Sequence, residues 1–310
     1  MHAAVVTSFD APPRYAEFAE PVAGADELVV EVVAAALHPR VRSQANGSHY
    51  TSTDELPLIP GIDAVVRDRQ GQLRYAVLDD TVRGTMADRT VIERHRSVVL
   101  PQHVDPVAVA AAMNPVMSSW VALRRRIDFT AGERVLILGA TGNAGRMAIQ
   151  VAKRFGTSEV IAAGRNRARL SELTALGADR TCTLDELTAA ADVDVVLDYL
   201  WGEPTVTAMT AMLPARADRS APLSWVQIGS IAGHDASIPS AALRSTRLQI
   251  VGSGIGSVPG RDFAEELAAI ATAITDGGFD IRTRVVPLAD VEDAWASVDG
   301  SAGERVVFAP

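Results

Sequence analysis

Two glycines in this chain of 310 residues have the spacing of a site for a phosphorylated ligand. The apolar run Val135–Leu138 is followed by Ala140, Gly142 and Gly145, in the pattern Ala-x-Gly-x-x-Gly. Gly142 would let a pyrophosphate approach the backbone, and Gly145 would let a helix pack closely on the strand. A helix starting here points free amides and its positive dipole end at the phosphates. The pattern predicts a dinucleotide site; the alternative is a strand-to-helix turn without a ligand.

Arginines in the next loop indicate which dinucleotide is bound. The second apolar run ends in Gly164-Arg165-Asn166-Arg167, where an NAD-binding protein would carry an acidic residue for the ribose hydroxyls. No acidic residue is present there, and a guanidinium suits a 2′-phosphate through paired, charge-assisted hydrogen bonds. We therefore predict NADP(H), with Arg165 as the main partner of the 2′-phosphate. The alternative for Arg165, Arg167 and Arg169 is a solvated helix start.

Strands and helices must alternate around these residues. From Arg134 onward, six short runs of strand length are separated by helical patterns, including a helix from Asn143 to Phe155. The six runs are Val135–Leu138, Val160–Ala163, Thr181–Thr183, Val193–Leu197, Val226–Ile228 and Leu248–Val251. They predict an α/β fold with a Rossmann doubly wound parallel sheet.

The segment before this sheet is expected to be mostly β, because it alternates at Leu28–Val33 and is rich in proline. A helix over Phe263–Ile274 and a last strand at Arg305–Phe308 are expected to complete this first lobe. The expected domains are residues 1–117 with 256–310, and residues 118–255.

Composition narrows the class of protein. The net charge of −9 argues against nucleic acid and anionic lipid as partners, and the single cysteine, Cys182, excludes an internal disulfide and a cysteine-rich zinc lobe. No export signal is visible, so we expect a cytoplasmic protein. The apolar run Val107–Leu123 is expected to form two packed helices rather than a membrane span, and Arg124–Arg126 a solvated helix end.

Further motifs, taken in order, resemble one enzyme superfamily. They are Val29–Ala35 with His38-Pro39, Leu56–Asp63, Gly84–Thr90, Leu176–Asp179 and Pro287–Ala294. Together with the glycine pattern they resemble the medium-chain dehydrogenase/reductase superfamily, specifically its zinc-free quinone oxidoreductase branch. The resemblance implies a GroES-like catalytic lobe, a Rossmann lobe, NADPH as cofactor and a homodimer. Zinc-dependent members carry a cysteine near position 38 and Gly-His-Glu near 61; here His38 and Gly61-Ile62-Asp63 predict no metal site.

The resemblance also implies site residues. His38 and Tyr50 flank the loop Arg40–His49, which matches the family's substrate loop. His38 is a candidate donor to a developing oxyanion, or else satisfies a backbone carbonyl; Tyr50 is a pocket wall or a proton donor. Ser118 is expected beside the nicotinamide, or else to be a helix N-cap. The expected cofactor-binding residues are Ser118, Ala140, Thr141, Gly142, Asn143, Ala144, Gly145, Gly164, Arg165, Asn166, Arg169, Tyr199, Gly229, Ser230, Ile231, Gly252, Ser253 and Gly254.

Zinc-free hydride transfer requires an electrophilic acceptor, because the protein supplies mainly geometry and exclusion of water. We therefore predict an NADPH-dependent reductase of a quinone or an α,β-unsaturated carbonyl, acting on a small molecule. One alternative is an enoyl thioester reductase, for which Arg40 and Arg42 would form a basic entrance. Another is a non-catalytic NADPH-binding or sensor protein, since His38 and Val41 replace an asparagine and an aspartate that relatives often carry.

Overall fold

A computed structural model of the chain describes residues 1–254, 256–297 and 304–310. The chain divides into two compact units: the first unit is residues 1–114 with 264–310, and the second unit is residues 115–263. The expected boundaries followed residues 117 and 255, so they differ from these by three and eight residues. Ile255, at the expected boundary, lies outside the described residues.

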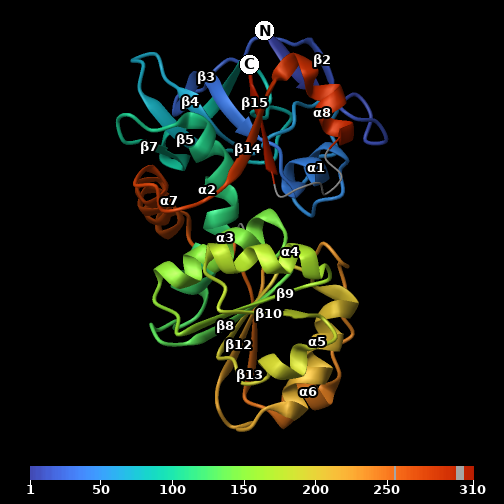
Figure 1. Cartoon of the computed structure of the whole chain (residues 1–310). Helices are drawn as coiled ribbons and strands as arrows, with labels where there is room; N and C mark the ends of the chain where they lie inside the picture. The colour runs from blue at the N-terminus through green and yellow to red at the C-terminus, as the bar shows by residue number, and fades with distance from the viewer. Residues whose placement is uncertain (255, 298–303) are drawn as a thin grey trace. The chain divides into compact units, whose positions relative to one another are not determined.

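The second unit contains a six-stranded, fully parallel sheet (Figure 1). Its strands are β8 (Arg134–Leu138), β9 (Glu159–Gly164), β10 (Arg180–Thr183), β11 (Val195–Asp198), β12 (Leu223–Gln227) and β13 (Leu248–Gly252). Their spatial order is β10-β9-β8-β11-β12-β13, which confirms the predicted doubly wound sheet. The order reverses direction between β8 and β11, and open sheets of this kind bind ligands outside the carboxyl ends of the strands at that point.

Helices cover both faces of this sheet. Figure 1 shows α3 (Asn143–Arg154) and α4 (Arg167–Ser171) on one face, with α5 (Gly202–Ala215) and α6 (Ser240–Ser245) on the other. Leu136 and Leu138 of β8 belong to the same core cluster as Met209 and Met212 of α5. Because alternate residues of a strand face opposite sides, the intervening Val135 and Ile137 line the α3 face. The residue pattern of β8 therefore explains why it is buried on both sides.

The apolar run after residue 105 forms one helix, so the prediction of two packed helices was wrong. Helix α2 (Pro106–Val121) continues directly into a π-helical segment, Ala122–Arg126. Pro115 lies inside α2, although an internal proline removes one helical hydrogen bond. The helical stretch Pro106–Arg126 is long and apolar enough for a membrane span, but 72% of its most apolar part is buried in the protein, as in a core helix of a globular domain.

The first unit is mostly β, as predicted. Strand β1 (His2–Val5) pairs with β2 (Arg14–Glu17), while the larger sheet has the order β14-β15-β3-β4-β5-β7, with β6 also paired to β3. These strands are β3 (Glu27–Ala36), β4 (Asp63–Arg67), β5 (Leu73–Val77), β6 (Arg89–Glu93), β7 (Ser97–Val99), β14 (Arg282–Pro287) and β15 (Glu304–Ala309). Because β15 pairs antiparallel with β3, the end of the chain completes the first unit, which confirms that prediction.

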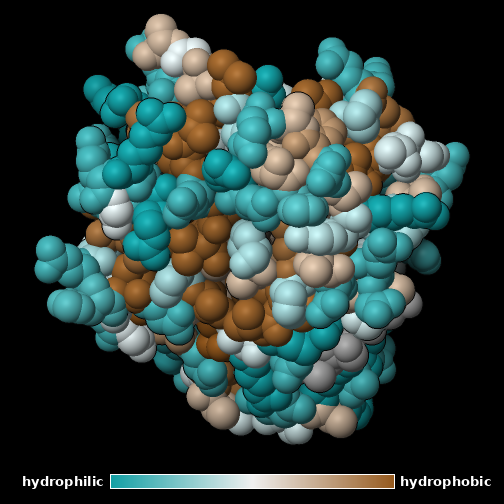
Figure 2. Space-filling view, turned by 90° about the horizontal axis from the view of Figure 1, so that it is seen from above, coloured by the Kyte–Doolittle hydropathy of each residue, from teal (hydrophilic) through white to brown (hydrophobic). Residues whose placement is uncertain are grey.

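Three further helices belong wholly or mostly to the first unit. They are α1 (Pro39–Ala45), α8 (Val291–Ser297) and most of α7 (Gly260–Thr275). Figure 2 shows one face of the molecule, on which hydrophobic side chains gather between hydrophilic ones. Two of the predicted site residues are strongly solvent-exposed apolar side chains: Tyr50 is 77% exposed and Ile231 is 74% exposed.

Candidate functional site

The turn between β8 and α3 is built on Gly139. Its φ is +82°, a conformation that favours glycine, and the amides of Gly139 and Ala140 donate to the carbonyl of Ala163 at 3.1 and 3.0 Å. The tight turn therefore lies one residue before the position at which the usual fingerprint carries its first glycine. Ala140 is fully buried. This explains why alanine is acceptable in that position.

The other two glycines have different surroundings. A Cβ atom on Gly145 would lie 2.5 Å from the Gly139 carbonyl oxygen, which is closer than real contacts allow, so Gly145 brings α3 against the turn. A Cβ atom on Gly142, the N-cap of α3, would meet only that same oxygen at 3.5 Å. Gly142 is exposed. Because glycine has no side chain, no side-chain hydrogen bond from Gly142 caps the first turn of α3, which contains Asn143 and Ala144. These residues fit a pyrophosphate at the start of α3.

The end of β9 supplies the arginines. Gly164 packs on the turn Gly139–Gly145, which we call the phosphate cradle, because a Cβ on Gly164 would lie 3.1 Å from Cγ2 of Thr141. Asn166 caps α4 by accepting a hydrogen bond from the Arg169 amide at 3.2 Å. Arg167 Nη2 donates to Glu186 Oε1 at 2.8 Å, so the alternative of a structural, solvated arginine fits Arg167.

Arg165 differs from these neighbours. Its side chain is exposed and, within the described part of the chain, it has no hydrogen bond or ion pair. It directly follows Gly164, at the carboxyl end of a strand next to the cradle strand in the sheet. A guanidinium in this position, without a carboxylate partner, is available to an anionic group of a ligand.

The carboxyl end of β11 is organised by Asp198. This buried carboxylate accepts hydrogen bonds from the amides of Leu200 and Trp201 at 2.8 and 3.1 Å, and from the side chains of Thr205 and Trp225 at 2.5 and 2.9 Å. Its oxygens are therefore fully used in shaping the turn. Asp198 thus fixes the backbone on which Tyr199 is carried.

Ser118 and Tyr199 share a hydrogen bond of 3.0 Å between their hydroxyl oxygens. Ser118 also donates to the carbonyl of Pro115 at 2.8 Å, so the Tyr199 hydroxyl is the donor in this pair. Burial raises the pKa of Tyr199 to about 12, which keeps the phenol protonated at neutral pH. Ser118 lies inside α2, so the alternative that it is a helix N-cap is wrong.

The predicted residues after β12 and β13 are connected to the same edge. The Gly229 amide donates to the Asp198 carbonyl at 3.1 Å, and the Gln227 side chain donates to the Gly229 carbonyl at 3.0 Å. The Ser253 amide donates to the Gln227 carbonyl at 2.8 Å. Hydrogen bonds thus join the segments Gly229–Ile231 and Gly252–Gly254 to the carboxyl ends of β11 and β12.

One residue at this edge was missed. Arg126 donates to the carbonyl of Gly252, the last residue of β13, and to the carbonyl of Ser257, so the prediction of a solvated helix end for Arg124–Arg126 was wrong for Arg126. Three adjacent arginines at a helix end gave no signal that would single out Arg126.

His38, in the first unit, is buried in a polar network. Its Nε2 lies 2.9 Å from Oδ1 of Asp63, and the Tyr75 hydroxyl donates to Oδ2 of Asp63. The side chains of His38 and Asp63 are 1% and 2% exposed. The partner is a carboxylate, so the alternative that His38 satisfies a backbone carbonyl was wrong. Arg305 lies nearby, donating to the Leu37 carbonyl at 3.0 Å; burial lowers its pKa to about 10.

This network does not fit a catalytic zinc site. A tetrahedral catalytic site needs three protein ligands and one open position. Here His38 and Asp63 are bonded to each other, and Ile62 stands beside Asp63 in place of a ligand. Across residues 1–254, 256–297 and 304–310, no three side chains of histidine, cysteine, aspartate or glutamate come together as a metal site would require.

The segment after His38 is held by Arg40. This side chain forms an ion pair with Asp80 and donates to the Thr51 hydroxyl at 2.7 Å. Arg42 donates to the Trp295 carbonyl at 2.7 Å, and its guanidinium lies 5.1 Å from the centre of the Trp295 ring. Both arginines of the suggested basic entrance are therefore engaged within the protein.

Tyr50 lies at the exposed end of this segment. Its ring centre is 4.2 Å from that of His49. Burial, and then the nearby Arg40 charge, lower the pKa of His49 from 6.5 to about 4. His49 is therefore neutral at physiological pH.

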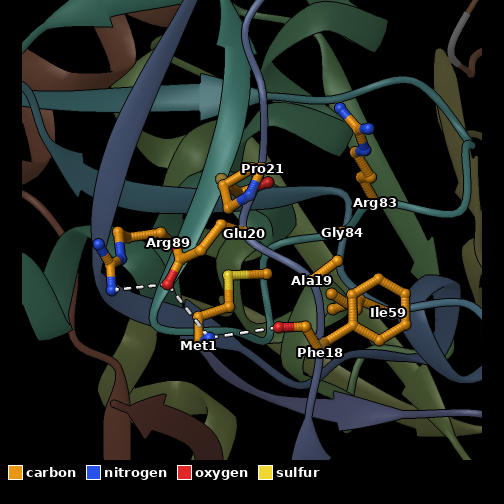
Figure 3. Close-up of a pocket in the computed structure, with 10 residues that line it drawn as sticks. Met1, Phe18, Ala19, Glu20, Pro21, Ile59, Arg83, Gly84 and Arg89 are labelled. Carbon is orange, nitrogen blue, oxygen red and sulfur yellow. Dashed lines mark hydrogen bonds and ion pairs between the residues drawn. The ribbon is translucent and has the colours of Figure 1, made fainter.

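A small pocket in the first unit contains none of the predicted site residues (Figure 3). The amino group of Met1 lies 3.2 Å from Oε1 of Glu20, which also accepts from Arg89 at 3.1 Å. Ile59 and Phe18 add apolar walls. These contacts hold the N-terminal segment in place and explain the pocket as a structural feature.

Comparison with known proteins finds dehydrogenases and quinone reductases that this chain resembles. The family model described as "Zinc-binding dehydrogenase" matches residues 144–272. A "Probable NADPH-dependent quinone reductase" of Emericella nidulans is 28% identical to this chain, and the alignment covers 100% of both proteins. These similarities support the medium-chain dehydrogenase/reductase superfamily, which the motifs of the sequence resemble.

Solved structures of quinone oxidoreductases have the same fold as this chain. A mycobacterial quinone oxidoreductase has a TM-score of 0.85 at 18% identity, and the quinone oxidoreductase of Thermus thermophilus one of 0.84 at 24% identity; each alignment covers 100% of both chains. The "NADPH-dependent alkenal/one oxidoreductase, chloroplastic" of Arabidopsis thaliana is 28% identical over 50% of this chain and 44% of that protein. The resemblance inferred from the motifs is thus confirmed, in the quinone-oxidoreductase-like branch.

Proposed function

We propose that this protein is an NADPH-dependent oxidoreductase that transfers a hydride to a quinone or an α,β-unsaturated carbonyl without zinc. The observation that carries the proposal is Arg165, exposed and without a protein partner next to the open turn at Gly142. A 2′-phosphate supplies the anion that this guanidinium lacks. The names of the relatives from Emericella nidulans and Arabidopsis thaliana support both the cofactor and the acceptor class.

NADPH, when bound, supplies the hydride, and the protein supplies position and polarity. The turn from Gly139 to Gly145 would hold the pyrophosphate, while Arg165 would hold the 2′-phosphate. The protonated Tyr199, Ser118 and the backbone at Gly229–Ile231 and Gly252–Gly254 would orient the nicotinamide end. His38 and Asp63 bind each other, so the acceptor must itself be electrophilic, as quinones and enones are.

The thioester alternative is less well supported. A phosphopantetheine carrier would require accessible positive charge at the entrance, but Arg40 is paired with Asp80 and Arg42 packs on Trp295. Acyl thioester turnover exceeding turnover of quinones and enones would reverse this ranking. For a purely NADPH-binding protein we would expect saturable binding with no oxidation of NADPH by any acceptor.

The proposal is tested by mixing the purified protein with NADPH and a panel of quinones, enones and enoyl thioesters. We expect loss of nicotinamide absorbance with a quinone or an enone, and no change in rate when a zinc chelator is added. A rate that disappears on chelation and returns with zinc would contradict the zinc-free part of the proposal.

We further propose that the protein works in the cytoplasm on a small molecule, with no nucleic acid or membrane partner, and forms a homodimer. The net charge of −9 supports the absence of a nucleic acid or anionic membrane partner. For the dimer, β13 is an edge strand of the parallel sheet, and Leu243 of the adjacent α6 is 51% exposed. Light scattering during size-exclusion chromatography would test the dimer; a mass near 32.8 kDa would contradict it.

A further inference from the structure

Arg126 connects the end of one helix to the end of one strand in the second unit. Its Nε donates to the carbonyl of Gly252 at 2.8 Å, and its Nη1 donates to the carbonyl of Ser257 at 2.8 Å. Gly252 is the last residue of β13. The two carbonyls therefore lie on either side of Ser253 and Gly254, which are expected to contact the nicotinamide.

The same helix is also attached at a second place on this edge of the sheet. Ser118 of α2 bonds Tyr199 directly after β11, and Arg126 ends the π-helical segment that continues α2. π-helical turns are rare and occur often at functional sites. One continuous helix is thus bonded to the carboxyl ends of both β11 and β13, the two strand ends that the proposed function places at the nicotinamide.

The segment after β13 needs such a restraint. Gly252, Gly254 and Gly256 give it high backbone freedom, and a Cβ on Gly252 or Gly256 would meet at most one distant atom. Within the segment, the hydroxyl of Ser257 bonds the Gly254 backbone at 2.7 Å. Arg126 is suited to hold two carbonyls at once, because a guanidinium is planar, always charged and presents several donors in fixed directions.

We propose that Arg126 is a positioning residue for the nicotinamide end of the coenzyme. By holding the carbonyls of Gly252 and Ser257, it keeps the backbone of Ser253 and Gly254 in the conformation that binds the nicotinamide and aligns it for hydride transfer. The inference rests on the proposed function. The neighbouring Arg125 provides a matched control, because it is the adjacent arginine of the same π-helical segment and its guanidinium lies 3.8 Å from Asp262 Oδ2.

The test compares two ligands on the same variants. NADPH reaches both ends of the coenzyme site, whereas adenosine 2′,5′-bisphosphate reaches only the adenosine end. For Arg126→Ala we expect the Kd for NADPH to rise about tenfold or more and kcat to fall by at least as much, because charge-assisted hydrogen bonds are lost. The Kd for adenosine 2′,5′-bisphosphate should stay within about twofold of the wild-type value.

Rescue and control variants complete the design. Arg126→Lys keeps the charge with fewer directed donors and should recover part of kcat, as should added guanidinium with Arg126→Ala. Arg125→Ala should leave both Kd values unchanged. Loss of affinity for both ligands alike, or wild-type kcat in Arg126→Ala, would overturn the inference. Failure of the wild-type protein to bind either ligand would instead overturn the proposed function, and this inference with it.

Discussion

His38 and Asp63 form a buried pair, with 2.9 Å between Nε2 and Oδ1, at the position where zinc-dependent relatives carry metal ligands. Tyr75 donates to the second carboxylate oxygen, and the pKa of Tyr75 is raised well above its usual value by burial and by the charge of Asp63. The carboxylate thus has a donor on each oxygen. This network stabilises the first unit through mutual hydrogen bonding of groups that would be costly to bury alone.

Replacing His38 is therefore expected to lower stability more than turnover. For His38→Ala we expect a loss of roughly 3 kcal/mol in the free energy of unfolding, because Asp63 loses one of its two donors inside the protein. Urea denaturation measures this loss. We expect kcat on a good quinone to stay within a factor of about three. A large fall in kcat with unchanged stability would show instead that His38 acts as an acid.

Substitution of Arg165 should change coenzyme preference. For Arg165→Ala we expect NADPH to bind about ten- to a hundredfold more weakly, with NADH unaffected, because only the 2′-phosphate loses its charged partner. Arg167→Ala is the control, since Arg167 is engaged with Glu186 and should change neither Kd by more than about twofold. Equal weakening of both coenzymes in Arg165→Ala would contradict this role.

The two glycines of the cradle should respond differently to alanine. Gly145→Ala should destabilise the second unit, because a Cβ there lies 2.5 Å from a backbone oxygen, whereas Gly142→Ala should fold normally. Binding of NADPH should nevertheless fall in Gly142→Ala, because the methyl group takes space needed by the pyrophosphate. Gly260→Ala is the control, with nothing within 4 Å of the added Cβ. Thermal denaturation with NADPH titration separates these outcomes; wild-type affinity in Gly142→Ala would refute the cradle.

The pKa of His49 predicts a pH effect on stability. Its pKa is lowered from 6.5 to about 4 in the folded protein, mainly by burial and also by Arg40, so the unfolded chain binds this proton more readily. The contribution of neutral His49 is complete above about pH 6.5 and is lost as the pH falls towards 4. Denaturation midpoints should therefore fall more steeply in wild type than in His49→Asn over this range. Parallel pH profiles of the two proteins would exclude this effect.

Local patterns were enough to predict the sheet and its cradle. The strand at Val135–Leu138, the turn and the helix from Asn143 are all encoded by neighbouring residues, and parallel order follows from regular alternation. The helix α2 was not predicted correctly, because Pro115 usually ends a helix and here does not. Burial along the helix outweighs the missing hydrogen bond.

Long-range pairs could not be predicted. Nothing near His38 indicates that Asp63, 25 residues later, would become its partner. Likewise, Arg126 donates hydrogen bonds to carbonyls that lie 126 and 131 residues later in the chain. In the sequence, Arg126 is one of three adjacent arginines, and nothing distinguishes it from the other two. Arg165 could be chosen from the sequence because it lies two residues after the predicted strand Val160–Ala163, at the edge where ligands of such sheets bind, in a loop without an acidic residue.

Calorimetric titration of the purified protein with NADPH and with NADH tests the central claim most directly. We predict saturable binding of NADPH at one site per chain, with NADH at least about tenfold weaker, because only NADPH carries the group that Arg165 is placed to bind. Absence of binding heat and saturation with either coenzyme at millimolar concentration would contradict the account.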